Sequence, residues 1–162
     1  MTPRPEDSPE ARVAAAAAER GHDFSGPLKI GDDDLPAVRH GEPVFVCGEF
    51  PRVGDAVVVT GRAGAETALP EARRTAAICA MRTLAALRPA LGSLERVAQL
   101  LRITVDVQSA GDFTGRSEAN AASALLRAVP GPAGGRARSS VGVFRLPQDA
   151  TVELHLVAAV RV

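Results

Sequence analysis

Two β-rich runs near the C-terminal end constrain the fold of this chain more than any other feature. They cover residues Ser140–Phe144 and Val152–Val160, and a Leu-Pro-Gln-Asp connection lies between them. β-Branched residues favour strands, and proline with aspartate favours a turn. Alternation along the second run places Glu153 and His155 on one strand face and aliphatic side chains on the other. The pattern predicts a strand that presents a carboxylate beside an imidazole.

Arg138 stands just before the first of these runs. We expect the two runs to be neighbours, which would bring its guanidinium beside the strand that carries Glu153 and His155. A guanidinium binds a carboxylate through two parallel hydrogen bonds, and carboxylate and imidazole groups transfer protons. The sequence therefore predicts a site that holds an anionic substrate and moves a proton. Three alternatives stay open: Arg138 as a surface residue, Glu153 as its salt-bridge partner, and His155 as a packed strand histidine.

The remaining segments predict an α+β fold. Proline and capping residues mark helix starts, and glycine marks helix ends. The expected helices are 8–20, 70–91 and 117–129, and the expected earlier strands are 37–39, 43–47, 56–60 and 97–108. In the last of these strands, alternation is expected to place one set of residues on a single face: Leu101, Ile103, Val105 and Val107. The order predicts a sheet with two helices packed on one face, plus an extra N-terminal helix.

The composition narrows the possible function classes. The 162 residues include nineteen basic and nineteen acidic side chains, five Phe, no Trp and no Tyr. A formal net charge of zero and few aromatic rings argue against nucleic-acid binding, and hence against a ribonuclease or translation inhibitor. The length suggests one domain, which we place at residues 34–162, after an N-terminal tail and appended helix in residues 1–33.

The cysteines and histidines indicate neither a metal site nor an exported protein. Cys47 and Cys79 have no metal-type spacing with each other or with the three histidines. No apolar run reaches membrane-spanning length, and the first residues do not read as a signal sequence. We therefore expect a cytoplasmic protein with free thiols, no metal, no cofactor, no membrane partner and no nucleic-acid partner.

The block from Ala137 to Glu153 has the pattern A-R-S-x-V-x-V-x-x-L-P-x-D-x-x-V-E. This pattern resembles the C-terminal signature of the RidA/YjgF family of reactive intermediate deaminases. Three further motifs occur in the family's order: Phe45–Glu49, Gly61–Gly64, and Asp112-Phe113 followed by Asn120. The resemblance implies a chorismate-mutase-like fold and a homotrimer whose ligand clefts lie between subunits. It also implies a small-molecule ligand with a carboxylate.

The resemblance implies roles for individual residues as well. In family deaminases, an arginine that matches Arg138 clamps the substrate carboxylate, and a glutamate that matches Glu153 activates water for attack on an imine carbon. An asparagine that roughly matches Asn120 lines the cleft. Backbone groups near Ser140 would fix the nitrogen or the water. Because His155 shares a strand face with Glu153, we predict it as a second catalytic residue.

The sequence departs from the family pattern at several cleft positions. Asp34 stands where family deaminases carry a tyrosine, and Ser140 replaces a cysteine. Cys47 and Glu49 replace a serine and a glutamine, and we predict both as cleft-lining residues, although Cys47 as a small hydrophobe remains an alternative. Loss of the tyrosine favours a non-catalytic trimeric binding protein for a small carboxylate. The retained Glu153 favours an enamine or imine deaminase, one that acts on a pathway-specific intermediate.

Overall fold

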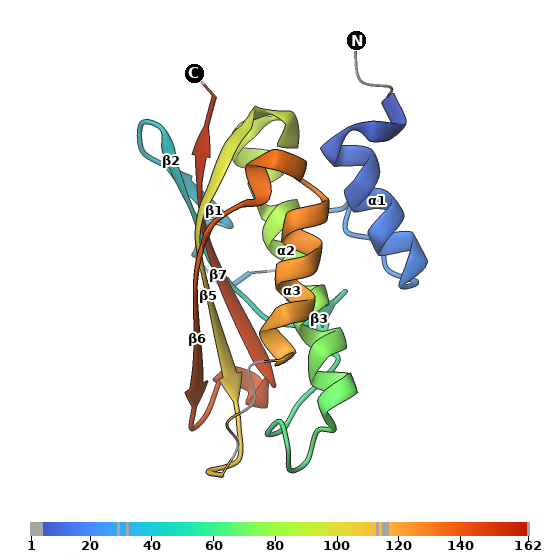
Figure 1. The fold of residues 1–162 in the computed structure, drawn as a ribbon, viewed down its shortest axis with the longest axis vertical. Coiled ribbons are helices and arrows are strands. Elements are labelled where there is room, and N and C mark those ends of the chain that lie inside the picture. Colours follow the sequence, from blue (N-terminus) through green and yellow to red (C-terminus); the bar gives the residue numbers. More distant parts are fainter. Residues whose placement is uncertain (1–4, 29, 32, 113, 115–116, 162) are drawn as a thin grey trace.

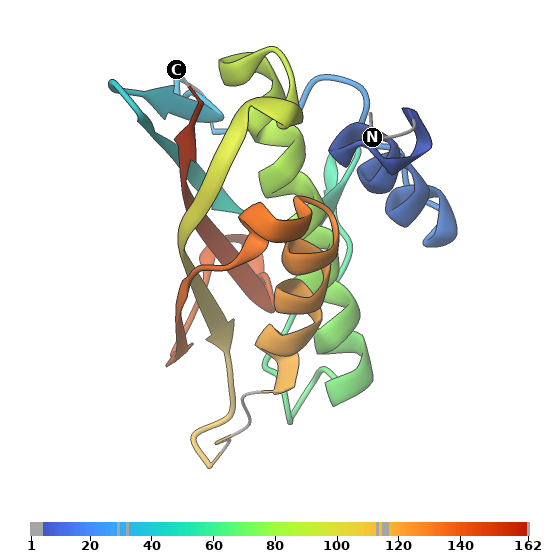
Figure 2. The same cartoon turned by 45° about the horizontal axis from the view of Figure 1, so that its top comes forward.

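Helices cover one face of a five-stranded sheet and leave its other face open (Figure 1). This architecture is seen in a computed structural model of the protein, which describes residues 5–28, 30–31, 33–112, 114 and 117–161. Two helices, α2 (Leu69–Leu91) and α3 (Ser117–Ala128), lie side by side against the sheet in both views (Figures 1 and 2). The predicted α+β fold with two helices on one face is confirmed.

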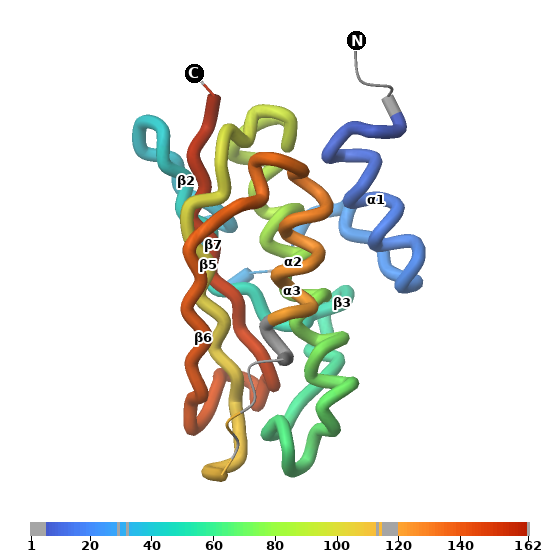
Figure 3. Tube along the Cα trace, in the orientation of Figure 1, coloured from blue at the N-terminus to red at the C-terminus, as the bar shows by residue number. Residues whose placement is uncertain are grey.

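The order of the strands in the sheet differs from their order along the chain. The strands are β1 (Ala37–Arg39), β2 (Pro43–Glu49), β5 (Val97–Gln108), β6 (Ala137–Val143) and β7 (Val152–Val160). They are arranged as β1-β2-β7-β5-β6, with β5 and β6 parallel and the other pairs antiparallel. A parallel pair needs a crossover connection, and α3 lies on that crossover (Figure 3).

The prediction that the two C-terminal runs are neighbours is wrong, because β5 lies between β6 and β7. In the ladder, Ile103 of β5 pairs with Arg138 on one side and with Leu156 on the other. Neighbouring strands lie about 4.8 Å apart, so β6 and β7 are separated by about 10 Å. The connection after β6 therefore passes β5 and does not close a hairpin with β7.

The N-terminal half of the sheet follows the prediction only in part. The hairpin of β1 and β2 is confirmed. The expected strand at residues 56–60 is confirmed only at its first two residues, because β4 (Ala56–Val57) is shorter than predicted. It pairs with β3 (Arg52–Val53) in a two-stranded ribbon that is separate from the main sheet. Beyond it, Thr60 forms an isolated bridge with Ala150. The strand therefore ends after Val57, and the rest of this apolar run has backbone partners in loops.

Alternate residues of the central strands form the core beneath the helices. In β7 these are Val152, Leu154, Leu156, Ala158 and Val160, all of them buried. The predicted apolar face of β5 is wrong at its start, where Leu100 is fully buried and Leu101 is 42% exposed. The ladder shifts register between Leu100 and Arg102, and the expected alternation holds from Ile103 onward.

The helix boundaries follow local signals. Proline stands in the first turn of α2, and Gly92, with φ of 79°, ends the helix in the left-handed conformation. Short 3₁₀ segments cover Pro5–Asp7, Leu94–Arg96, Gly131–Gly134 and Pro147–Asp149. Among the described residues, no helix combines the length and the apolar character that a membrane crossing requires.

The N-terminal helix α1 (Pro9–Glu19) lies outside α2 and α3, as Figure 1 shows. Val13 and Ala17 are nonetheless buried against the core. Oε2 of Glu10 accepts a hydrogen bond from Nε of Arg88 at 2.8 Å, which ties the helix to the end of α2. The division of the chain after residue 33 stays a prediction.

Candidate functional site

The open face of the sheet carries three titratable side chains, which we call the open-face cluster: Asp106 of β5 with Glu153 and His155 of β7. Nε2 of His155 lies 3.3 Å from Oδ2 of Asp106 and 3.6 Å from Oε1 of Glu153. Asp106 pairs with Glu153 in the ladder, so the two carboxylates project from adjacent positions. All three side chains are partly buried. Glu153 and His155 thus share a face as the alternation predicts, and Asp106 joins them.

The surroundings of Glu153 in this cluster raise its pKa. Burial raises the pKa of Glu153; His155 opposes this shift, and the negative charge of Asp106 adds to it. A carboxyl group with a raised pKa exchanges protons closer to neutral pH, which suits general acid–base chemistry. The ligand atoms of the three side chains also lie within 4.8 Å of one another, and such a donor set could hold a divalent ion. The expectation of no metal stays a prediction.

Glycine at position 48 makes room for this cluster. A Cβ on Gly48 would collide with Oε1 of Glu153 and would lie 2.8 Å from Cε1 of His155. The ladder between β2 and β7 shifts register between Val46 and Glu49, so the backbone bulges where it meets the cluster. Position 48 therefore requires glycine, because the side chains of Glu153 and His155 approach its backbone.

Arg138 lies on the other side of the sheet. Its NH1 donates hydrogen bonds to Oδ1 of Asn120 at 2.9 Å and to Oγ of Ser123 at 3.0 Å, both on α3. Arg138 pairs with Ile103, which is fully buried beneath the helices, whereas Glu153 projects from the open face. One protomer therefore brings Arg138 together with Asn120 but not with Glu153. The alternative of a salt bridge between Arg138 and Glu153 is wrong within a protomer.

Ser140 follows Arg138 on the same side of β6. It pairs with Val105 of β5 and is exposed, because β6 is the last strand of the sheet order. Within the described ranges, no strand pairs with the outer edge of β6. A ligand or a second chain can therefore approach Ser140 and Arg138 along this edge.

Cys47 and Glu49 contact each other at the end of β2. Sγ of Cys47 donates to Oε1 of Glu49 at 3.5 Å, and Nε of Arg82 on α2 donates to Oε2 at 2.8 Å. Burial raises the pKa of Glu49, and Arg82 opposes that shift. Burial and the charge of Glu49 raise the pKa of Cys47 to about 12, with a small contribution from the exposed Asp34. Cys47 is thus a neutral thiol near pH 7 and a poor nucleophile.

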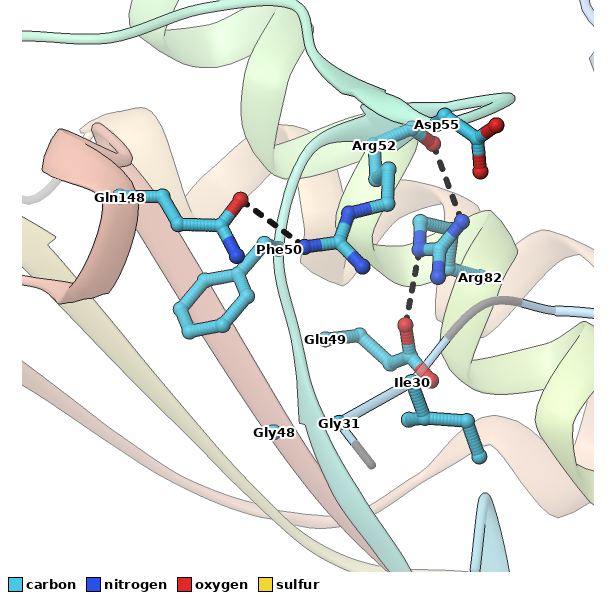
Figure 4. A pocket seen from close by; sticks show the side chains of 9 residues that line it. All are labelled: Ile30, Gly31, Gly48, Glu49, Phe50, Arg52, Asp55, Arg82 and Gln148. Carbon is cyan, nitrogen blue, oxygen red and sulfur yellow. Dashed lines mark hydrogen bonds and ion pairs between the residues drawn. The ribbon is translucent and has the colours of Figure 1, made fainter. Parts of the chain in front are cut away.

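A cavity of about 320 Å³ lies beside this ion pair (Figure 4). Its wall includes Gly48, Glu49, Phe50, Arg52, Arg82 and Gln148. NH2 of Arg52 donates to Oε1 of Gln148 at 2.9 Å, and NH1 of Arg82 donates to the backbone oxygen of Arg52 at 3.1 Å. Gly48 separates the two parts of the site, because it lines the cavity and also meets the open-face cluster.

Sequence reasoning missed Asp106, Arg52, Arg82 and Gln148. Two of these residues could have been recognised in the sequence. Asp106 is a single charge between Val105 and Val107. Arg82 is the one charged residue between positions 75 and 87 of a predicted helix. A lone charge in a buried element needs a partner, which marks such positions as candidates. Arg52 and Gln148 lie in short loop segments without such a signal.

Known proteins resemble this chain in sequence and in fold. No family model matches the chain. Protein TCP17 of Trypanosoma cruzi is 34% identical over 145 residues, which is 88% of this chain and 91% of that protein. Atu1372 of Agrobacterium tumefaciens, a protein of unknown function, is 27% identical with a TM-score of 0.83, over 94% of this chain and 95% of that one. The YjgF gene product of E. coli has the same fold, with 24% identity and a TM-score of 0.56, over 86% of this chain and 97% of that one.

The chain belongs to the RidA/YjgF family. Its chorismate-mutase-like fold is the one that the C-terminal block predicts. In this RidA/YjgF protein, the family positions fall on two sides of one sheet, with Glu153 on the open face and Arg138 near Asn120 on the helical side. Phe113 of the Asp-Phe motif lies outside the described residues.

Proposed function

We propose that this RidA/YjgF protein hydrolyses the imine or enamine of a small carboxylate-bearing intermediate and releases ammonia and a keto acid. The observation that carries the proposal is the open-face cluster, in which Glu153 has a raised pKa and lies 3.6 Å from His155. Membership of a family that contains deaminases supports the reaction type. Both cysteines are free thiols, which supports action in the cytoplasm.

The chemistry needs one group that both takes and gives a proton. Water adds to the imine carbon, and Glu153 takes a proton from that water as the new C–O bond forms. That proton passes to the nitrogen and gives a carbinolamine. Glu153 then transfers the hydroxyl proton to the nitrogen, the C–N bond breaks with its electron pair leaving on ammonia, and the carbonyl forms. An enamine first gains a proton on carbon, which yields the imine. His155 orients Glu153 and shares its proton through these steps.

We assign the substrate carboxylate to Arg138, whose guanidinium is oriented by Asn120 and Ser123. Because Arg138 and Glu153 of one protomer lie on different sides of the sheet, a small ligand meets both only when a second copy supplies one of them. We therefore propose a homotrimer with clefts between its copies. Apolar side chains on the open face support an assembly that covers them: Val38 at 49%, Phe45 at 51% and Val141 at 47% exposure.

A non-catalytic binding protein for a small carboxylate is the alternative. Asp34, in the position of the family's tyrosine, is exposed and adds negative charge close to Cys47, which disfavours an anionic substrate. In this case Arg138 binds the ligand and Glu153 has a structural role. We favour the enzyme because Glu153 is partly buried with a raised pKa, which destabilises the fold. Carboxyl groups perturbed in this way are frequent at sites of proton transfer.

A screen of carboxylate-bearing imines and enamines, read by thermal shift and then by ammonia release, tests the reaction. We expect the wild type to accelerate release, Glu153→Gln to lower the rate by about 100-fold or more, and Arg138→Ala to weaken carboxylate binding by about 10–150-fold. Arg74→Ala, an exposed arginine on α2, is the matched control. A wild type that binds carboxylates without accelerating release would favour the binding protein.

Light scattering on the purified protein tests the assembly. We expect three times the protomer mass at micromolar concentration. A monomeric mass would contradict the trimer and, with it, the cleft between copies. Unchanged carboxylate affinity in Arg138→Ala would remove that residue from the site.

A further inference from the structure

The cavity beside β2 is lined by charged side chains that are almost fully buried. Glu49 is 1% exposed, Arg82 is 3% exposed and Arg52 is 8% exposed. Burial of charge is costly, and a buried ion pair is seldom more stabilising than apolar side chains of similar size. The fold therefore gains little stability from a charged cavity wall, and recognition of a polar ligand is the better explanation.

We propose that this cavity binds a neutral carboxamide or ureido group on the ligand. The proposal rests on the proposed function: Gly48 lines the cavity and also borders the open-face cluster, and we assign both to one substrate. The protein would then recognise two groups on the ligand, the carboxylate and the amide or ureido group. The substrate class becomes a small acid that carries an amide or ureido group at its other end.

Gln148 supplies a hydrogen-bond donor to this group. Arginine can only donate, so Gln148 must turn Oε1 toward NH2 of Arg52, which lies 2.9 Å away. The amide nitrogen of Gln148, the other polar atom of the same planar group, is then turned away from Arg52 and can donate to a carbonyl oxygen. Figure 4 shows Gln148 and Glu49 reaching the space around Arg52 from separate parts of the chain.

Glu49 supplies the matching acceptor. Its oxygens accept from Cys47 and Arg82, and a carboxylate has about four acceptor positions. An N–H group of the ligand can therefore donate to Glu49. A planar group with both a carbonyl oxygen and an N–H satisfies Gln148 and Glu49 together, and carboxamide and ureido groups have this form.

The backbone at Gln148 supports a positioned side chain. Gln148 has φ of 56° and ψ of 22°, and Asp149 has φ of 57°, a left-handed conformation that is unusual outside glycine. Oδ1 of Asp149 accepts from Gln108 at 2.7 Å and from Arg145 at 2.9 Å, which holds the turn in place. The chain thus maintains a strained turn whose consequence is to bring the amide of Gln148 to the cavity.

The charge of the lining favours a neutral group over a second carboxylate. Among the described residues, the cavity wall has two guanidinium groups, from Arg52 and Arg82, and two carboxylates, from Glu49 and Asp55. The charges of opposite sign balance, so the wall provides no net attraction to offset the desolvation of a second carboxylate. The cavity volume of about 320 Å³ lies at the small end of ligand pockets, which suits one polar group of a small metabolite.

Calorimetry on the full-length protein with matched probes tests the inference. Succinamate, succinate and butyrate share one chain length, and glutaramate, glutarate and valerate share the next. At one of the two lengths we expect the amide probe to bind about tenfold more tightly than the apolar probe, as about two net hydrogen bonds would give. The same amide should also bind more tightly than its dicarboxylate.

Two variants test the role of Gln148. Gln148→Glu keeps the size and the acceptor for Arg52 but loses the amide donor, and Gln148→Gly removes the side chain while suiting the positive φ. In both variants the preference for the amide should fall from about tenfold to about threefold, because only the hydrogen bond to Glu49 remains. A preference that stays near tenfold in both variants would overturn the inference.

The probe series also separates this inference from the proposed function. Equal binding of amide and apolar probes by the wild type would overturn the amide site and leave the carboxylate site intact. Tightest binding of the dicarboxylates would have the same meaning. If none of the six carboxylates binds, the proposed function fails, and the amide site fails with it.

Discussion

Gly48→Ala is expected to destabilise the protein, because its new methyl group would collide with the open-face cluster. A Cβ there would overlap Oε1 of Glu153 and lie 2.8 Å from Cε1 of His155. The side chain of Glu153 is only 17% exposed and is held against His155, so it cannot simply move into solvent. Overpacking of this kind costs about 1–3 kcal/mol. At about 2–4 °C per kcal/mol for a domain of this size, Tm should fall by about 2–12 °C.

A double-mutant cycle shows whether Glu153 is the cause. In a Glu153→Ala background the carboxylate is gone, so Gly48→Ala should cost about 1–2 kcal/mol less than in the wild type. Urea unfolding at one fixed protein concentration gives the four free energies. Gly26→Ala is the matched control, because a Cβ there meets nothing within 4 Å. If the cost of Gly48→Ala is the same in both backgrounds within about 0.5 kcal/mol, the collision is not the cause and the reasoning is refuted.

Arg82→Ala should destabilise the protein by about 3–5 kcal/mol in urea unfolding, because Glu49 would remain buried without its ion-pair partner. Adding Glu49→Gln should recover part of that loss. A double variant no more stable than Arg82→Ala would contradict the role of the buried charge. Asp106→Asn should lower the pKa of Glu153, since the charge of Asp106 raises it, and NMR titration of the carboxyl carbon measures the shift. The pKa of Cys47 is raised from 9.0 to about 12 in the folded protein, so its contribution to stability is complete below about pH 9 and is lost as pH rises toward 12. Cys47→Ala should reduce that alkaline loss, and an unchanged pH dependence would count against the burial of this thiol.

Local geometry explains what the sequence predicts well. The two faces of β7 follow from alternation along one strand, so Glu153 and His155 could be placed together without knowledge of any other element. The boundaries of α2 follow from a proline in its first turn and from Gly92 at its end. These features depend on neighbouring residues along the chain.

Pairing between distant segments explains what the sequence did not predict. Nothing in β6 or β7 by itself indicates that β5 lies between them, because strand order is decided by burial of all the faces together. The bulge that buries Leu100 and exposes Leu101 likewise depends on the register with β7. The ion pair of the site was missed for the same reason, because Arg82 and Glu49 lie 33 positions apart in the sequence.

The division of the site between two sides of the sheet has a consequence for its chemistry. Arg138 is held by α3 and can orient a carboxylate in a single protomer, whereas Glu153 faces the open side with Gly48 at its back. β5 alone separates the two strands by about 10 Å, which is longer than a small imino acid. In the proposed trimer, carboxylate binding and proton transfer therefore belong to different copies, so assembly creates the complete site. The charged cavity lies on the helical side of this division, because Glu49 pairs with the buried Leu154 and is bonded to Arg82 of α2. The backbone of Gly48 lies between this cavity and the carboxylate of Glu153.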